Sequence, residues 1–229
     1  GLTLKQDKSS NRVRWEVEYP RGRSNGGATL ELRVPRSVEV QLGTISADID
    51  VADIDVRRLQ ANSVSGSITA AGRSGETTLN TVSGGIRSQL QTARLDARTV
   101  SGQLLAGGGA SGEVAAESVS GRVNVNAGRI QRLAVETVSG SLDVSATGMA
   151  PGGKVTMQTV SGSVALKLPA TVSAQLNVKT FSGGIQSDAG QVEKPRYGPG
   201  SSLDARLGSG DGDISINSHS GSVRVSLGR

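Results

Sequence analysis

The chain has 229 residues, a net charge of +5, no cysteine, and only one Trp, two Tyr and one Phe. The lack of cysteine excludes disulfides and thiolate chemistry, and no apolar run approaches the ~18 residues of a membrane-spanning helix. With so few aromatic residues, we expect a thin core of Val, Leu, Ile and Ala. Because the first residue is Gly1, we also expect a processed or engineered N-terminus that would lack any targeting signal.

The first part of the chain differs from the rest. Residues 1–11 are polar and are expected to fray. Residues 12–19 alternate apolar and charged side chains, which predicts a half-buried strand. A loop at 20–27 follows, and the alternation resumes as far as Pro35. Because the ends of a solenoid expose unpaired strand edges, we predict that residues 1–38 form an N-terminal β cap.

A four-residue motif, Thr/Ser-Val-Ser-Gly or a close variant, recurs through the remaining sequence. Successive copies are 18 to 22 residues apart, except for a final gap of 38. A fixed period near 20 residues is typical of solenoids. The nine copies begin at Thr44, Ser63, Thr81, Thr99, Ser118, Thr137, Thr159, Thr180 and Ser218.

Aligning the copies gives five columns of mainly apolar residues that alternate with other residues, a period of two that predicts strands. We therefore predict an all-β fold, a single-chain β-solenoid of about nine stacked coils with ~19-residue repeats over 39–229. Stacking is expected to bury all five columns, since like residues lie ~4.8 Å apart along the axis. The glycines are expected where the bending chain approaches its neighbour closely. The third column, within the motif itself, is Ile45, Val64, Val82, Val100, Val119, Val138, Val160, Phe181 and His219.

A charged column supports this stacking. Its signs alternate over the first six copies, and opposite charges at strand spacing attract. Each exposed pair contributes only ~0.2–1 kcal/mol, so the column favours a parallel, in-register stack more than it adds stability. The last copy in the sequence is expected at the end of the stack. The column reads Glu39, Arg58, Glu76, Arg94, Glu113, Arg132, Lys154, Gln175 and Asp213.

One connection is much longer than the others. Residues 188–212 are predicted to form a long loop excursion that covers the flank or the lower end of the stack. Long loops on a rigid scaffold are places where binding sites occur.

The sequence resembles the toast-rack family of bacterial, adhesin-like β-strand-repeat envelope proteins from about Ala28 onward. The resemblance implies an exported protein of the periplasm or cell surface, a non-enzymatic adhesin-like or interaction scaffold with no catalytic, cofactor or metal residues. The sequence departs from the repeat at Ala47 and His219, which we place at the two ends of the stack. The motifs that carry the resemblance are Leu32-Arg33-Val34-Pro35 leading into Thr44-Ile45-Ser46, the serial repeats, Tyr197-Gly198-Pro199-Gly200-Ser201, Gly210-Asp211-Gly212-Asp213-Ile214-Ser215-Ile216 and Ser220-Gly221-Ser222-Val223.

An enzyme is the alternative hypothesis. Asp48, Asp50, Asp53 and Asp55 could supply the paired carboxylates of a polysaccharide-active β-helix enzyme. The aromatic platforms that hold sugars are almost absent, so a solvated acidic turn is the preferred interpretation. His219 is the only histidine, which excludes a multi-histidine site; we expect it to be partly buried in a terminal coil.

Other ligand sites are disfavoured by the same kind of reasoning. Residues 208–213 are Gly-Asp rich but do not repeat, so a plain turn is preferred to a calcium site. The Thr/Ser and Ser columns are expected to share a face as a hydroxyl ladder; an ice-binding surface would need more methyl groups. Nucleic acid binding is disfavoured because Arg alternates with Glu.

The expected partners are therefore an envelope glycan or a protein, bound on the strand faces, the 188–212 excursion or the stack ends. Self-assembly is a lesser alternative. It would use the strand edge of the C-terminal coil, which ends almost immediately at Arg229 and could pair end to end with another molecule.

Overall fold

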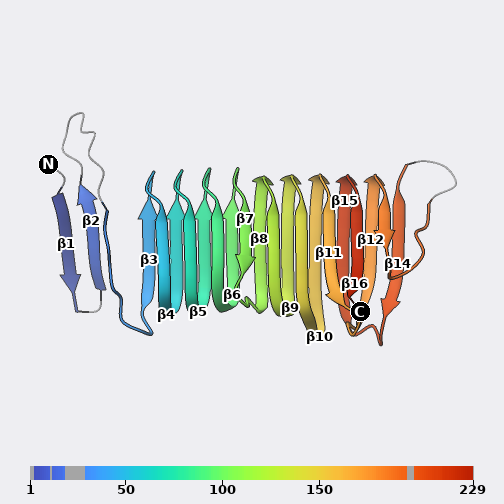
Figure 1. Ribbon diagram of the computed structural model, residues 1–229, viewed down its shortest axis with the longest axis horizontal. Coiled ribbons are helices and arrows are strands. Elements are labelled where there is room, and N and C mark those ends of the chain that lie inside the picture. Colours follow the sequence, from blue (N-terminus) through green and yellow to red (C-terminus); the bar gives the residue numbers. More distant parts are fainter. Residues whose placement is uncertain (1–2, 11, 19–28, 195–198, 229) are drawn as a thin grey trace. The chain divides into compact units, whose positions relative to one another are not determined.

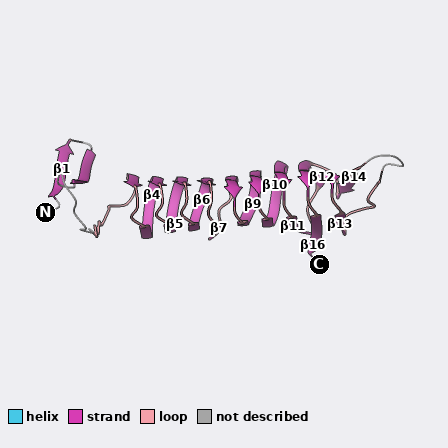
Figure 2. Ribbon diagram, turned by 90° about the horizontal axis from the view of Figure 1, so that it is seen from above, coloured by secondary structure: helices cyan, strands magenta, loops and turns pink. Residues whose placement is uncertain are grey.

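The computed structural model describes residues 3–10, 12–18, 29–194 and 199–228. Within these ranges the elements are all strands, joined by turns and bends, so there is no helix that could cross a membrane (Figure 2). The chain forms two compact units, Gly1–Val34 and Pro35–Arg229. The predicted all-β class is confirmed.

The first unit contains an antiparallel hairpin of β1 (Thr3–Ser9) and β2 (Arg12–Glu18). The expectation that residues 1–11 fray is wrong for β1, because its backbone pairs with the predicted strand. An ion pair of 2.5 Å between Lys5 and Glu18 joins the two strands and raises the pKa of Lys5. Residues 30–34 form no strand, and the predicted loop at 20–27 lies outside the described residues. The capping role of this unit remains a prediction.

The second unit is a solenoid in which strands from successive repeats pair in parallel (Figure 1). The register is that of the sequence alignment; for example, Ile68 pairs with Ile86 and Arg94 with Glu113. Its first strands are β3 (Glu39–Thr44), β4 (Ile49–Ser63), β5 (Ile68–Thr81), β6 (Ile86–Thr99), β7 (Leu104–Gly107), β8 (Gly112–Ser120), β9 (Val123–Ser139), β10 (Leu142–Ser161) and β11 (Val164–Pro169).

The core between the coils is narrow and aliphatic, as composition predicts. Core side chains such as Leu59, Leu79, Leu95 and Leu133 are almost fully inaccessible to solvent. The described part of the chain buries no aromatic side chain. Each coil covers the apolar residues of its neighbours, so the core is continuous along the stack.

The glycine of each motif lies directly against the corner of the adjacent coil. A Cβ atom added to Gly84 would lie 2.1 Å from the carbonyl oxygen of Gly66, and one added to Gly140 would lie 1.9 Å from that of Gly121. Because no earlier corner precedes Ala47 within this unit, the first motif accommodates alanine. The predicted close approach is therefore confirmed.

The last strands do not follow the order of the sequence. β15 (Gly212–Ser220) pairs with β10 on one side and with β12 (Ala174–Ser182) on the other. Likewise β16 (Val223–Gly228) lies between β11 and β13 (Ile185–Ser187) (Figure 2). The C-terminal coil is thus inserted between two earlier ones.

This insertion corrects two expectations. The chain winds regularly through only seven of the nine motifs, so the predicted count of about nine coils exceeds the roughly seven regular turns. The C-terminal coil is not at the end of the stack: β16 pairs with β11 over its whole length and with β13 over Val223–Val225. The strand edge expected at the end of the stack is therefore an inner strand, and self-assembly stays a prediction.

The 188–212 excursion is partly a strand. β14 (Ser201–Leu207) pairs antiparallel with the outer edge of β12, so the far end of the stack is covered by this segment. Pairing an edge in this way protects it from association with other chains.

Candidate functional site

The repeated motif forms one corner of every coil, and the period-2 alternation breaks there. The first residue points inward: it is only 4–6% exposed in the eight copies from Ser63 to Ser218. The second and third residues both point outward, because the chain turns between them and the glycine. The predicted burial of the third column and the shared face of the two hydroxyl columns are therefore wrong.

The outward second residues form a line of apolar side chains along the stack, here called the corner stripe. The six valines from Val64 to Val160 are each 45–51% exposed. Such a continuous apolar line on a monomer's surface marks an interaction site more often than scattered apolar residues do. In stacking order its members are Ile45, Val64, Val82, Val100, Val119, Val138, Val160, His219 and Phe181.

An aromatic pair lies at the far end of the corner stripe. The rings of Phe181 and His219 are stacked, with centroids 4.9 Å apart and planes 4° from parallel. His219 is exposed, which corrects the expectation of a partly buried histidine in a terminal coil. The insertion of β15 beside β12 is what brings these two residues, 38 positions apart, into contact.

A shallow cavity of about 930 Å³ follows the corner stripe from Thr81 to Phe181 and is called the corner groove. One wall is formed by polar side chains that lie two positions before the corner stripe, from Asn80 to Lys179. The whole column, which extends beyond the groove to Asn62 and Gly43, is here called the rim column. In stacking order the rim column is Gly43, Asn62, Asn80, Arg98, Glu117, Glu136, Gln158, Asn217 and Lys179.

The rim column carries charge at its centre. Arg98 contacts Asp96 at 2.9 Å and Glu117 at 3.4 Å, and the hydrogen bond that Arg98 donates to Asp96 is the main cause that raises the pKa of Arg98. Glu117 and Glu136 are direct neighbours in the register. Like charges placed opposite each other destabilise a sheet, so this pair favours a ligand that brings a hydrogen-bond donor or a cation.

The buried hydroxyls beneath the corner stripe fall into two groups. Thr81 donates to the carbonyl of Gly66 (3.2 Å) and accepts from the backbone N–H of Gly84 (3.1 Å). From Ser118 onward the same hydroxyls have no hydrogen-bond partner among the described residues. There the glycine N–H donates instead to a serine carbonyl of the adjacent coil, as Gly140 does to Ser161 at 3.0 Å.

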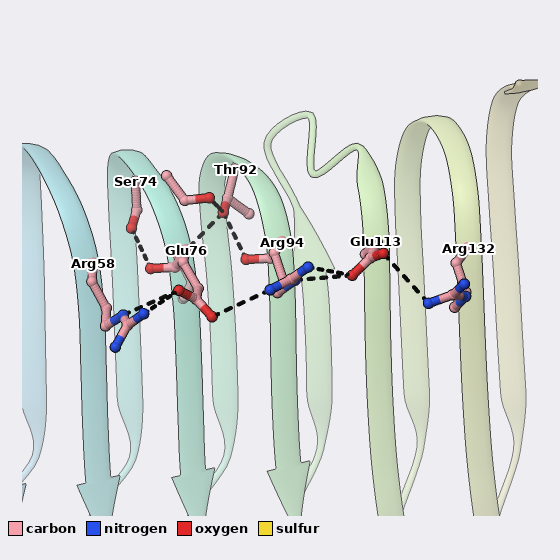
Figure 3. A network of polar contacts seen from close by, with 9 residues as sticks. Arg58, Ser74, Glu76, Thr92, Arg94, Glu113 and Arg132 are labelled. Atoms are coloured by element: carbon pink, nitrogen blue, oxygen red, sulfur yellow. Dashed lines mark hydrogen bonds and ion pairs between the residues drawn. The ribbon is translucent and has the colours of Figure 1, made fainter.

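The predicted charge ladder is present as a separate column (Figure 3). Glu76 lies 2.7 Å from Arg58 and 3.6 Å from Arg94, and Glu113 lies 2.8 Å from Arg94 and 3.4 Å from Arg132. The first member departs from the prediction, because Glu39 pairs with Arg57 at 3.9 Å.

The aspartates considered for catalysis are exposed and do not line the corner groove. Asp48 accepts a hydrogen bond from the backbone N–H of Ser67 at 2.7 Å, which is a structural contact between coils. In the described part of the chain, no three metal-binding side chains gather into a site.

The Gly-Asp segment near residue 211 is a turn between β14 and β15, as predicted. Asp211 accepts hydrogen bonds from Ser209 (2.5 Å) and Ser173 (3.0 Å), and these bonds lower the pKa of its carboxyl group.

A parallel stack with a continuous core, register-fixing ion pairs and an exposed line along one corner defines a rigid β-solenoid scaffold. Residues 2–226 match the model of the family described as Toastrack DUF4097. The chain therefore belongs to the Toastrack family. No curated protein and no solved structure matches the sequence.

Proposed function

We propose that this scaffold is a non-enzymatic, adhesin-like interaction module of the bacterial cell envelope, exported to the periplasm or the cell surface. The observation that carries this proposal is the corner groove, floored by the half-exposed valines of the corner stripe and bordered by the polar rim column. An apolar centre bordered by polar side chains is the usual composition of a binding surface.

Several features of the molecule support binding rather than turnover. The groove is open and lies along a surface corner, whereas general acid–base catalysis needs poised groups in a water-excluding cleft. The carboxylates nearest each other in it, Glu117 and Glu136, stand side by side on one wall. They do not face each other across a space that a scissile bond could occupy.

The test is a binding screen against peptidoglycan, lipopolysaccharide, envelope glycans and envelope proteins, with substrate turnover measured in parallel. We expect binding without turnover, and we expect the Val119→Ser, Val138→Ser double variant to bind at least tenfold more weakly. Val13→Ser in the N-terminal unit, also exposed, is the matched control.

Turnover of any glycan would overturn the proposal and favour the alternative enzyme; Asp48→Asn with Asp50→Asn would then show whether those carboxylates act. Binding that persists in the valine variant would show that the binding surface lies outside the corner groove. No binding to any of these ligands or envelope proteins would contradict the envelope role.

A further inference from the structure

The corner stripe has a feature that restricts its partner: it repeats at the spacing of the coils. Neighbouring strands lie ~4.8 Å apart, so a side chain is presented at each such step along the axis. A partner that contacts every valine must repeat at the same spacing, since any other repeat loses register after a few steps. An extended peptide laid along the axis advances by ~3.4 Å per residue and does not match.

A second copy of this chain carries the same spacing by construction. We propose that two copies of the protein pair side by side and antiparallel through their corner stripes, with Val100 of each copy facing Val119 of the other. This inference rests on the proposed interaction role of the corner groove and names its partner. The two-fold axis passes between the fourth and fifth coils, as in an isologous dimer.

The rim column determines the orientation. When two stripes face each other about a two-fold axis perpendicular to the stack, each rim column lies against the other in reverse order. In the proposed register Arg98 faces Glu117 of the second copy, and this contact occurs twice. Asn80 faces Glu136 and Asn62 faces Gln158, so amide donors meet acceptors along the wall. The like-charged neighbours Glu117 and Glu136 each receive a donor.

The same column disfavours the adjacent registers. A shift of one coil in one direction places Arg98 against Arg98 of the second copy. A shift in the other direction places Glu117 against Glu117, and a further coil places Glu117 against Glu136. Registers that pair Lys179 with the glutamates avoid repulsion but overlap only four or five coils, as the stacking order shows. The proposed register overlaps eight.

The expected affinity is modest. Eight coils give a contact roughly 35 Å long, but it is only one side chain and one rim wide. The surface area that each copy buries is therefore smaller than the ~800 Å² per partner of a standard stable interface. The dimer is thus expected to be reversible and to form at high protein concentration.

The experiment is sedimentation of the full chain over a wide concentration range. We expect reversible dimerisation that Val100→Asp with Val119→Asp weakens at least tenfold while the circular dichroism spectrum is unchanged. Phe181→Ser is the control, because Phe181 is 55% exposed but lies outside the eight overlapping coils. A strictly monomeric protein at the highest concentration, or a dimer that depends on Phe181, would overturn the proposal.

Two charge variants test the register directly. Arg98→Glu and Glu117→Arg each place like charges across the two-fold axis, so each variant alone should dimerise more weakly. Mixed together, they should form a heterodimer in which both contacts are again between opposite charges. If the mixture associates no better than its components, the register is wrong. Envelope binding by a strictly monomeric protein would refute the pairing and leave the proposed function standing.

Discussion

The two parts of the solenoid are built from the same repeat but are connected differently. From β3 to β10, each coil packs on the coil that precedes it in the sequence. Beyond β10, the last coil of the sequence lies between its two predecessors, and β14 covers the outer edge of β12. Equal repeats thus fix how coils pair, while the connections decide which coils are neighbours.

The corners differ in a second way. In the early coils the buried hydroxyl of the motif bonds to glycine backbone groups. In the later coils those hydroxyls have no partner within the described ranges, and the glycine N–H donates to a carbonyl of the adjacent coil. The same four-residue motif therefore supports two hydrogen-bonding arrangements. Substitutions that are identical in sequence should consequently have different effects in the two parts.

The largest expected effect tests the position of the last coil. Ile216 and Leu42 occupy the same column, but Ile216 is fully buried and Leu42 is only partly buried in the first coil. Ile216→Asp should cost more than about 4 kcal/mol of unfolding free energy, because it buries a charge. Leu42→Asp should cost much less. Denaturant unfolding measures both, and equal, small losses would contradict the insertion.

The next effect concerns the corner glycines. A Cβ atom at Gly221 would lie 1.8 Å from the carbonyl oxygen of Gly162, and its φ of +150° also disfavours alanine. Gly221→Ala should cost about 3 kcal/mol or more. Gly148→Ala meets no atom within 4 Å and should change stability by less than about 1 kcal/mol. Thermal unfolding distinguishes the two; similar values would show that the coils separate easily at the corner.

A pair of isosteric changes tests the two hydroxyl arrangements. Thr81→Val removes a partner of the Gly84 N–H and should cost about 1–3 kcal/mol. Thr137→Val removes a buried hydroxyl that has no hydrogen-bond partner among the residues that the structure describes, and it should be neutral or stabilising. Both variants keep the side-chain shape, so a difference in unfolding free energy reports hydrogen bonding. Equal losses would show that the later hydroxyls are also paired.

The smallest effect is a pH dependence in the inserted part. Hydrogen bonds from Ser209 and Ser173 lower the pKa of Asp211 below its ordinary 3.8, so its charged form stabilises the folded state. That contribution is present at neutral pH and disappears as the pH falls through the lowered pKa. The melting temperatures of the wild type and Asp211→Asn should differ slightly at pH 7 and converge in acid. A difference that grows in acid would reverse the assigned sign.

Much of the fold follows from the repeat alone. The columns, the parallel register and the ion pairs from Arg58 to Arg132 are all set by residues that recur at one spacing. The outward turn of the corner valines could not be predicted from alternation, because alternation holds only within a strand and the corner interrupts it. Alternation therefore does not predict the corner stripe, although its members form a column in the aligned repeats.

The insertion of the last coil left one signal in the sequence. In sequence order the charged column places Arg132, Lys154 and Gln175 together, whereas the structure places Asp213 next to Lys154. Extending the rule that signs alternate would have favoured this arrangement. The contact between Phe181 and His219 depends on the insertion and could not be predicted without it.

The inserted coil also has a consequence for how the protein is made. Most coils can pack as soon as they leave the ribosome, since their neighbour is already present. β12 and β13 cannot reach their final positions until residues 212–228 have been synthesised, because those residues lie between them and the finished stack. Residues 212–228 therefore complete the stack last, and a chain that stops before them cannot form its far end.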